Sequence, residues 1–287
     1  MADTNPVKKK KAGSKPDLAT LGGLVVALAG ILGGMLLEGG KVKDVSQLTA
    51  AMIVLGGTIG AVMVTTPLPV LLRALGKLGA VFMDASQAPD ALIEEILGYA
   101  GKARKHGVVA LEQDAAQVSD PFLRKALNLA VDGTDLQELR KMMELEMAIE
   151  EQRGEAEAKV YEAAGGYAPT IGIIGAVLGL IQVMKHLENI EEVGKGIAVA
   201  FVATIYGVAS SNLFFIPAGN KLKARLHHRM ETRELMLDGV VGIVEGLNPK
   251  LIRAKLEAYT NTGAPAKASK KKAAEARPTG APAAAEG

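Results

Sequence analysis

Apolar and charged residues are segregated along this chain. Four long stretches contain no Asp, Glu, Lys, Arg or His: residues 18–37, 45–72, 163–184 and 196–220. Each is at least 20 residues long, and a helix of about 20 residues covers the roughly 30 Å hydrocarbon core of a bilayer. Buried helices of soluble proteins are usually shorter and carry a polar stripe, which these stretches lack. The pattern therefore predicts four transmembrane helices.

The first stretch follows a basic start, with lysines at 8–11 and Lys15, as a signal peptide would. Its uncharged core of 20 residues is longer than the usual apolar region of about 7–15 residues, and a second stretch follows almost at once. We interpret it as a retained first span.

Basic residues near the ends of the stretches predict the orientation. Five lysines precede the first span, Arg73 and Lys77 follow the second, and residues 221–229 after the fourth contain four more Lys or Arg. The turns at 38–44 and 185–195 balance acidic against basic side chains. Because cytoplasmic loops carry the excess of Lys and Arg, we predict a multi-pass membrane protein with both termini in the cytoplasm.

These features divide an all-α, four-span chain into six parts. We expect a basic cytoplasmic arm at 1–17 and a first transmembrane hairpin at 18–72, with spans at about 18–37 and 47–68. A helical cytoplasmic insert at 73–162 precedes a second hairpin at 163–220, with spans at about 166–186 and 196–217. A cytoplasmic helix at 221–257 and a disordered basic tail at 258–287 complete the chain.

The insert has the signals of consecutive helices. Asp120-Pro121 is typical of an N-cap followed by Pro at the first helical position, and Asp132-Gly133 marks a break. Residues 134–137 fit a capping box, and no Pro follows until residue 169. We therefore predict one long helix that continues into the third span, with Gly165-Gly166 as the point where it would loosen.

The composition excludes several classes of protein. The 33 basic and 31 acidic residues leave a net charge of +2, too small to indicate nucleic-acid binding. The chain has no cysteine, which excludes disulfides, thiol catalysis and cysteine metal sites. The four histidines lack metal-ligand spacing, and there is no phosphate-binding loop or nucleophile elbow. We expect neither an enzyme nor a resident cofactor.

The four spans contain no ionisable side chain. A protein that moves ions by itself usually carries such a group inside the membrane. Any carboxylate that binds and releases an ion must therefore come from another subunit.

The spans are instead rich in small residues and contain some hydroxyls. Gly175 and Gly179 in the third span are spaced for close helix approach, and the fourth span carries Thr204, Ser210 and Ser211. One interpretation is ordinary helix packing. The other is a smooth face against which a further helix sits or slides.

Two prolines interrupt the second hairpin, Pro169 at the start of the third span and Pro217 near the end of the fourth. Each lacks an N–H and frees a backbone carbonyl one turn earlier, which predicts a kink. Because these spans run in opposite directions, both prolines are expected toward the cytoplasmic face at similar depth. This coincidence favours a mechanistic role.

These residues resemble a known family. The segment PTIGIIGAVLG at 169–179, the pair Tyr206-Gly207 and Pro217, together with two hairpins around an insert, resemble MotA/PomA, the larger stator subunits of the bacterial flagellar motor. The resemblance covers roughly residues 18–257. The related TolQ and ExbB proteins share the second hairpin but have a single span before their cytoplasmic segment. The two spans here favour the flagellar branch.

The resemblance implies a pentameric ring around a dimer of a MotB-like single-span partner, whose aspartate binds the ion. It also implies that ion passage steps the ring and that the insert pushes on the rotor protein FliG. The functional prolines of the family correspond to Pro169 and Pro217.

The family's rotor-facing charges are an Arg and, eight positions later, a Glu, which correspond to Arg104 and Glu112. Considered without the resemblance, these two belong to a solvated charged face, since Lys102, Lys105 and Asp114 lie alongside. A single exposed ion pair contributes only about 0–1 kcal/mol. Such charges can therefore steer a contact without locking it.

The resemblance also bears on the transported ion. Sodium-driven members tend to have Thr where this chain has Ala176, whereas the Thr of the fourth span is present as Thr204. A hydroxyl is an oxygen ligand for a dehydrated cation and a methyl group is not. Protons are therefore favoured over sodium ions.

Two other functions stay open at this point. One is a TolQ/ExbB-type energiser of envelope transport, which uses the same core for a different load. The other is a membrane scaffold without ion coupling.

Overall fold

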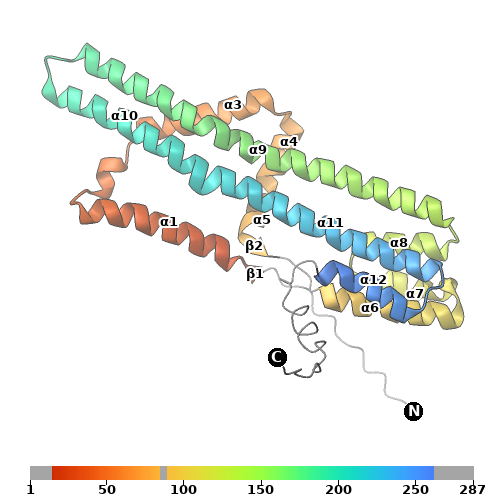
Figure 1. Ribbon diagram of the computed structural model, residues 1–287. Helices are drawn as coiled ribbons and strands as arrows, with labels where there is room; N and C mark the ends of the chain where they lie inside the picture. The colour runs from red at the N-terminus through yellow and green to blue at the C-terminus, as the bar shows by residue number, and fades with distance from the viewer. Residues whose placement is uncertain (1–14, 85–88, 262–287) are drawn as a thin grey trace, which may run out of the picture. The chain divides into compact units, whose positions relative to one another are not determined.

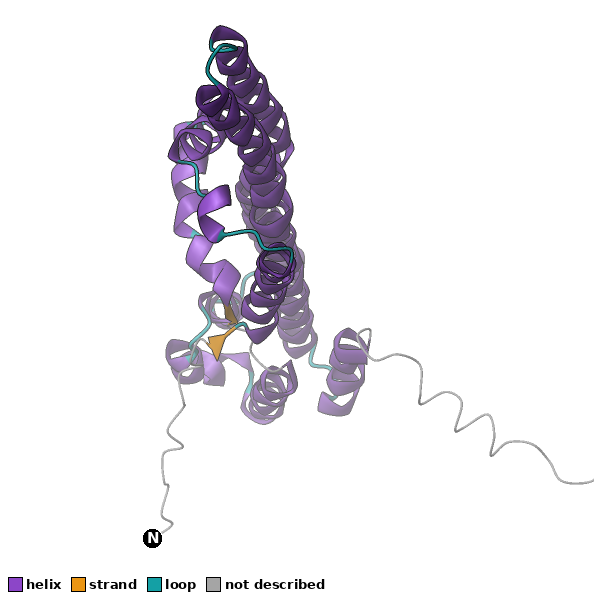
Figure 2. Ribbon diagram, turned by 90° about the vertical axis from the view of Figure 1, so that its left-hand side faces the viewer, coloured by secondary structure: helices purple, strands orange, loops and turns teal. Residues whose placement is uncertain are grey.

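The computed structural model describes residues 15–84 and 89–261, and nearly all of them are helical (Figures 1 and 2). Within this part, four helices are long and apolar enough to cross a membrane: Leu18–Leu37, Val42–Thr65, Leu136–Lys185 and Ile190–Val244. The predicted all-α, four-span fold is confirmed. The structure adds one short antiparallel pair of strands, β1 (Lys15–Pro16) with β2 (Met83–Asp84).

The described residues form two compact units. Unit 1 takes its residues from Met1–Gln87 and Glu144–Met230, and unit 2 from Ala88–Met143 and Glu231–Gly287. The chain passes from one unit to the other within two long helices, α9 (Leu136–Lys185) and α11 (Ile216–Val244).

Unit 1 begins with a helical hairpin. The carboxylate of Asp17 accepts from the backbone N–H groups of Ala19 and Thr20 at 3.1 and 3.2 Å and so caps α1 (Leu18–Leu37). Gly39, just past the helix end, has φ +85, a conformation that favours glycine. The chain returns through the 3-10 helix η1 (Val42–Val45), α2 (Leu48–Ala51), the π-helical turn η2 (Met52–Gly56) and α3 (Gly57–Thr65).

The second span ends earlier than the predicted residue 68. α3 ends at Thr65, Thr66 adopts an extended backbone, and Pro67 precedes a separate helix, α4 (Leu68–Gly76). The physical reason is that a residue before proline disfavours the helical conformation. The short helix α5 (Leu78–Phe82) then leads into β2.

The second hairpin of unit 1 consists of long helices. α9 continues without interruption through Gly165-Gly166, as the predicted long helix requires, but without loosening there. Asn189 caps α10 (Ile190–Ser210), the π-helical turn η4 (Ser211–Phe215) follows, and α11 continues directly from it. Figure 1 shows α9 running beside α10 and the first part of α11.

Unit 2 contains shorter helices together with the first turns of α9 and the last part of α11. They are α6 (Pro89–His106), the 3-10 helix η3 (Val108–Leu111), α7 (Glu112–Gln117), α8 (Pro121–Val131) and α12 (Pro249–Asn261). Asp120 caps α8 with its carboxylate 2.8 Å from the N–H nitrogen of Phe122. The break predicted at Asp132-Gly133 is present, where Gly133 has φ +73.

The single helix predicted for 221–257 is two helices. α11 ends at Val244, Gly246 has φ +68, and the Asn248 side chain accepts from the N–H of Lys250 in the first turn of α12. Because α12 runs to Asn261, residues 258–261 are helical and not part of the predicted tail. The rest of that tail, and residues 1–14 of the predicted basic arm, lie outside the described part.

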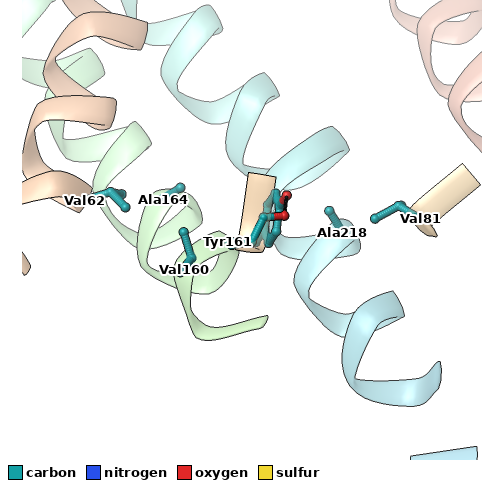
Figure 3. Close-up of a cluster of buried hydrophobic side chains, with 7 residues drawn as sticks. Val62, Val81, Val160, Tyr161, Ala164 and Ala218 are labelled. Atoms are coloured by element: carbon teal, nitrogen blue, oxygen red, sulfur yellow. Dashed lines mark hydrogen bonds between the residues drawn. The ribbon is translucent and has the colours of Figure 1, made fainter. Parts of the chain in front are cut away.

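Buried side chains join the two hairpins of unit 1. The cluster contains Val62, Ala74, Val81, Val160, Tyr161, Ala164 and Ala218, drawn from α3, α4, α5, α9 and α11 (Figure 3). The hydroxyl of Tyr161 donates to the carbonyl of Ala74 at 2.7 Å, which satisfies the polar end of a buried ring. This cluster holds α4 against α9.

Candidate functional site

The backbones of α9 and α10 are in direct contact. A methyl group at Gly207 would lie 2.6 Å from the carbonyl oxygen of Ala168, and one at Gly172 would lie 2.9 Å from that of Ala203. Atoms so placed would overlap, so these positions require residues without a side chain. Small residues allow membrane helices to approach this closely.

Gly175 and Gly179 point into the same interface. A methyl group at Gly175 would lie 2.7 Å from Cβ of Ala203, and one at Gly179 would lie 2.8 Å from the backbone of Gly196 and Ala200. The sequence left two interpretations open for these glycines: ordinary helix packing, or a face for a further helix. The structure shows that both pack inside the hairpin.

Pro169 lies within α9, is partly buried, and does not interrupt the helix. Because proline has no N–H, the carbonyl of Gly165 one turn earlier loses its usual donor. The hydroxyl of Ser211, where α10 meets η4, donates to this carbonyl at 2.7 Å. The freed carbonyl thus has a partner on the neighbouring helix.

Pro217 lies two residues beyond η4, in the first turn of α11. The N–H of Ile216, just before it, donates to the carbonyl of Ser211 five residues earlier, which is the π-helical pattern. Pro217 also lines an apolar cavity of about 350 Å³ together with Ala19 and Gly23 of α1. Pro217 therefore lies between the π-helical turn η4 and the apolar cavity beside α1.

The segments around the two prolines touch each other. A methyl group at Gly165 would lie 2.6 Å from Cγ1 of Ile216, the residue before Pro217. The two prolines accordingly lie in one layer of unit 1, as the antiparallel course of the spans predicts.

Ala176 on α9 and Thr204 on α10 are both partly buried. The Thr204 hydroxyl donates to the carbonyl of Ala200 in its own helix at 3.1 Å. This bond satisfies its hydrogen, and its oxygen keeps acceptor capacity. The choice of ion stays a prediction.

In unit 2, Arg104 and Glu112 flank a tight turn. Arg104 lies in the last turn of α6, Gly107 has φ +81, and Glu112 begins α7. Both side chains are exposed, and neither forms an ion pair within the part of the chain that the structure describes. Lys102 and Asp114 beside them pair at 2.6 Å. One pair of charges, Lys102 with Asp114, therefore holds α6 to α7, whereas Arg104 and Glu112 form no ion pair with any described residue.

A charged cluster that the sequence analysis missed lies at the start of α1. Oδ2 of Asp17 lies 2.6 Å from Nζ of Lys221 and 2.7 Å from the guanidinium of Arg225, both on α11. Arg225 also donates to the carbonyl of Met83 in β2 at 2.5 Å. Hydrogen bonds from Lys221, the Thr20 backbone and Arg225 hold the pKa of Asp17 well below its ordinary value. The cluster ties α1, β2 and α11 together.

Tyr206 joins the second hairpin to the first. Its hydroxyl donates to the carbonyl of Val45 at 2.6 Å and accepts from the N–H of Gln47 at 3.2 Å. A tyrosine in an otherwise uncharged span indicates that its hydroxyl has a polar partner. Val45 precedes it by 161 residues, so the sequence did not identify that partner.

Known proteins match both halves of the chain. The family model for the Motility protein A N-terminal region matches residues 21–102, and that for the MotA/TolQ/ExbB proton channel family matches residues 114–235. Motility protein A of Bacillus subtilis (strain 168) is 35% identical over 244 residues, which cover 85% of this chain and 90% of that protein. The chain belongs to the motility protein A branch of the MotA/TolQ/ExbB proton channel family.

Further relatives agree with this assignment. The chemotaxis protein PomA of Vibrio alginolyticus is 34% identical over 247 residues, 86% of this chain and 96% of that protein. The solved MotAB structure of C. jejuni matches with a TM-score of 0.82 at 32% identity, covering 87% of this chain and 98% of that one. The flagellar MotAB stator complex of Bacillus subtilis matches with a TM-score of 0.79 at 35% identity, covering 88% of this chain and 98% of that one.

The chain is therefore a flagellar motor stator subunit, and the TolQ/ExbB-type alternative is not supported. In this motility protein A-type chain, the two prolines and the close α9–α10 contact form one continuous region of unit 1. The exposed charges Arg104 and Glu112 belong to unit 2. The predicted roles of these residues are developed next as proposals.

Proposed function

We propose that this stator subunit forms a pentamer around a MotB-like single-span partner and converts ion flow through that complex into torque. The observation that carries the proposal is the absence of Asp, Glu, Lys, Arg and His from the four long apolar stretches at 18–37, 45–72, 163–184 and 196–220. A protein that moves ions usually carries such an ionisable group inside the membrane, so we assign the ion-binding aspartate to the partner. The similar solved structures are complexes of MotA with MotB, in agreement with this division of labour.

The basic residues after the second and fourth spans orient the chain. Their positions support an orientation with both termini and unit 2 in the cytoplasm and the four spans in the inner membrane. Unit 2 then meets the rotor, and the flagellar protein FliG is the partner at this contact. Motion is the output of this proposed contact, and the proposal involves no catalytic step.

Arg104 and Glu112 are the rotor-facing charges in this proposal. Their support is that both are exposed and form no ion pair among residues 15–84 and 89–261, whereas the neighbouring Lys102 and Asp114 pair with each other. We expect the double reversal Arg104→Glu with Glu112→Lys to reduce swimming speed severalfold, with partial rescue by compensating charge changes in FliG. Lys105→Glu, at an exposed neighbouring position, is the matched control. Normal swimming by the double variant at several expression levels would show that Arg104 and Glu112 only form part of a solvated charged surface.

Pro169 and Pro217 couple ion passage to movement of the ring. Their support is the contact between the surrounding segments and the irregular backbone before Pro217. One charge crossing 100 mV yields about 2.3 kcal/mol, so each step is small and many ions pass for each turn of the rotor.

Protons are the transported ion in this proposal. A dehydrated sodium ion is held by oxygen ligands. Thr204 offers a hydroxyl, but the methyl group of Ala176 offers no second one. Motor speed in sodium-free medium with the proton gradient intact tests the choice, and a stopped motor would contradict it.

The experiment that tests the ion-coupling proposal is ion conduction on co-expression. The chain alone should not conduct ions across the membrane, whereas the chain together with its MotB-like partner should conduct. Replacing the partner's intramembrane Asp with Asn should abolish conduction. Conduction by this chain alone would contradict the proposal.

A further inference from the structure

One serine hydroxyl in the second hairpin behaves differently from its neighbours. Thr170, Thr204 and Ser210 each donate to a carbonyl three or four residues earlier in their own helix. The Ser211 hydroxyl instead crosses to α9 and donates to the Gly165 carbonyl at 2.7 Å. Ser211 is almost fully buried, with 1% of its surface exposed, so water does not compete readily for this bond.

The acceptor of this hydrogen bond is set by Pro169. In a regular helix the N–H of residue 169 would donate to the carbonyl of Gly165, and proline cannot do so. Neighbouring serine and threonine side chains are one way in which membrane helices satisfy carbonyls freed by proline. Ser211 therefore supplies from α10 the donor that Pro169 withholds from α9.

The same serine also leads to the second proline. Its backbone carbonyl accepts from the N–H of Ile216 across the π-helical turn, and Ile216 directly precedes Pro217. A continuous chain of contacts thus runs from Pro169 through the Gly165 carbonyl, Ser211 and Ile216 to Pro217. π-helical turns of this kind often occur at functional sites.

The Ser211 hydroxyl also has an alternative acceptor. Rotation about χ1 directs a helical serine toward a carbonyl of the preceding turn, which for Ser211 is that of Gly207. Ser210 already donates to the same carbonyl at 3.2 Å. A hydrogen bond between membrane helices shifts an equilibrium by only about threefold on average. The cross-helix bond is therefore weak enough to be exchanged for the local one during a movement.

We propose that Ser211 is a positioning residue that couples the two prolines of this stator subunit. In the state seen here its hydroxyl holds the carbonyl freed by Pro169 and fixes α9 against the start of α11. When the hydroxyl turns back to its own helix, the Pro169 segment is released to bend. The inference rests on the proposed role of the prolines in coupling, and it adds the side chain that links them.

Hydrogen exchange tests the link without relying on ion flow. The sample is the full chain with its MotB-like partner in nanodiscs, and the readout is amide exchange in peptides covering 163–175. Ser211→Ala should speed exchange by about threefold, Ser211→Cys, a weaker donor, should give an intermediate value, and the matched control Ser210→Ala should leave it unchanged. In a Pro169→Ala background, the new N–H satisfies Gly165 and Ser211→Ala should have no further effect.

Rotation of tethered cells tests the positioning role in the same variants. Ser211→Ala should slow the motor by about twofold to threefold at normal stator levels in the membrane, with Ser211→Cys intermediate and Ser210→Ala unchanged. Equal effects of Ser211→Ala on exchange with and without Pro169 would overturn the link, and unchanged rotation would overturn the positioning role. If Pro169→Ala cells rotate normally while the exchange results hold, the coupling role of Pro169 fails and the hydrogen bond itself stands.

Discussion

The first helix α1 and the second hairpin are both rich in glycine, yet they use it differently. Added methyl groups at the α1 glycines Gly22, Gly23, Gly30, Gly33 and Gly34 would meet nothing within 4 Å, and α1 has no buried residue. Methyl groups at Gly172, Gly175, Gly179, Gly196 and Gly207 would each meet atoms of the facing helix at less than 3 Å. The glycine content of a span therefore indicates only that another helix can approach it closely. Whether one does depends on the residues of the neighbouring helix.

The hairpins also differ in how polar groups attach them. α1 is tied to the rest of unit 1 at its start, through Asp17 with Lys221 and Arg225. The second hairpin is held by backbone contact along its length, with Ser211 as a polar link between its helices. We infer a peripheral first helix and a tightly packed second hairpin in which one hydrogen bond is exchangeable.

The largest stability difference between the hairpins is expected from a single methyl group. Gly207→Ala places Cβ 2.6 Å from a backbone oxygen of α9 and should destabilise unit 1 by about 1–3 kcal/mol, the usual cost of overpacking. Gly30→Ala in α1 meets nothing and should stay within about 0.5 kcal/mol. Denaturation of the purified protein measures both changes, and equal losses would remove the contrast between the hairpins.

A smaller effect is expected where the hairpins meet. Tyr206→Phe removes the hydroxyl that bonds Val45 and Gln47 while keeping the ring. The loss should be about 1 kcal/mol, the typical net contribution of a hydrogen bond, and should loosen residues 45–47 in hydrogen exchange. Unchanged exchange at these residues would show that Tyr206 does not hold the first hairpin.

The smallest effect concerns the charge at the start of α1, and it depends on pH. Asp17→Asn keeps an N-cap residue but removes the partner of Lys221 and Arg225. Because the folded state lowers the pKa of Asp17, its charge stabilises the fold above the ordinary carboxyl range near pH 4, and this contribution declines as the pH falls below that range.

The thermal midpoints of the wild-type chain and Asp17→Asn should therefore differ at pH 7, and the difference should shrink steadily as the pH falls below about 4. A difference that stays constant with pH would show that Asp17 does not act through its charge. Asp44→Asn, which affects a cap in the exposed 38–44 turn, controls for loss of an unrelated carboxylate.

Several features could be predicted because their causes are local. Four uncharged stretches predict four spans, and a proline predicts a freed carbonyl from its own covalent structure. The break before α12 also had local signals, Gly246 and Asn248-Pro249, but the uniform charge pattern of 221–257 obscured them. The early end of α3 also had a local signal, because Thr66 precedes Pro67 and a residue before proline disfavours the helical conformation.

Other features depend on contacts between distant parts of the chain. Ser211 stood in the sequence as one of several hydroxyls, and only the approach of α9 distinguishes it from Ser210. Asp17 and Arg225 are 208 residues apart, and no periodicity connects them. The predicted ion and rotor roles of Ala176, Thr204, Arg104 and Glu112 depend on other subunits, which a single chain does not contain.

The most direct test of the account is the rotation speed of cells carrying Pro169→Ala, compared with Pro67→Ala in the first hairpin. Both variants should enter the membrane and assemble with the partner at normal levels. We predict that Pro169→Ala abolishes or sharply reduces rotation, because α9 loses its freed carbonyl and its link to Ser211, whereas Pro67→Ala rotates nearly as the wild type. Normal rotation with Pro169→Ala, or equal losses in both variants, would contradict the claim that coupling resides in the second hairpin.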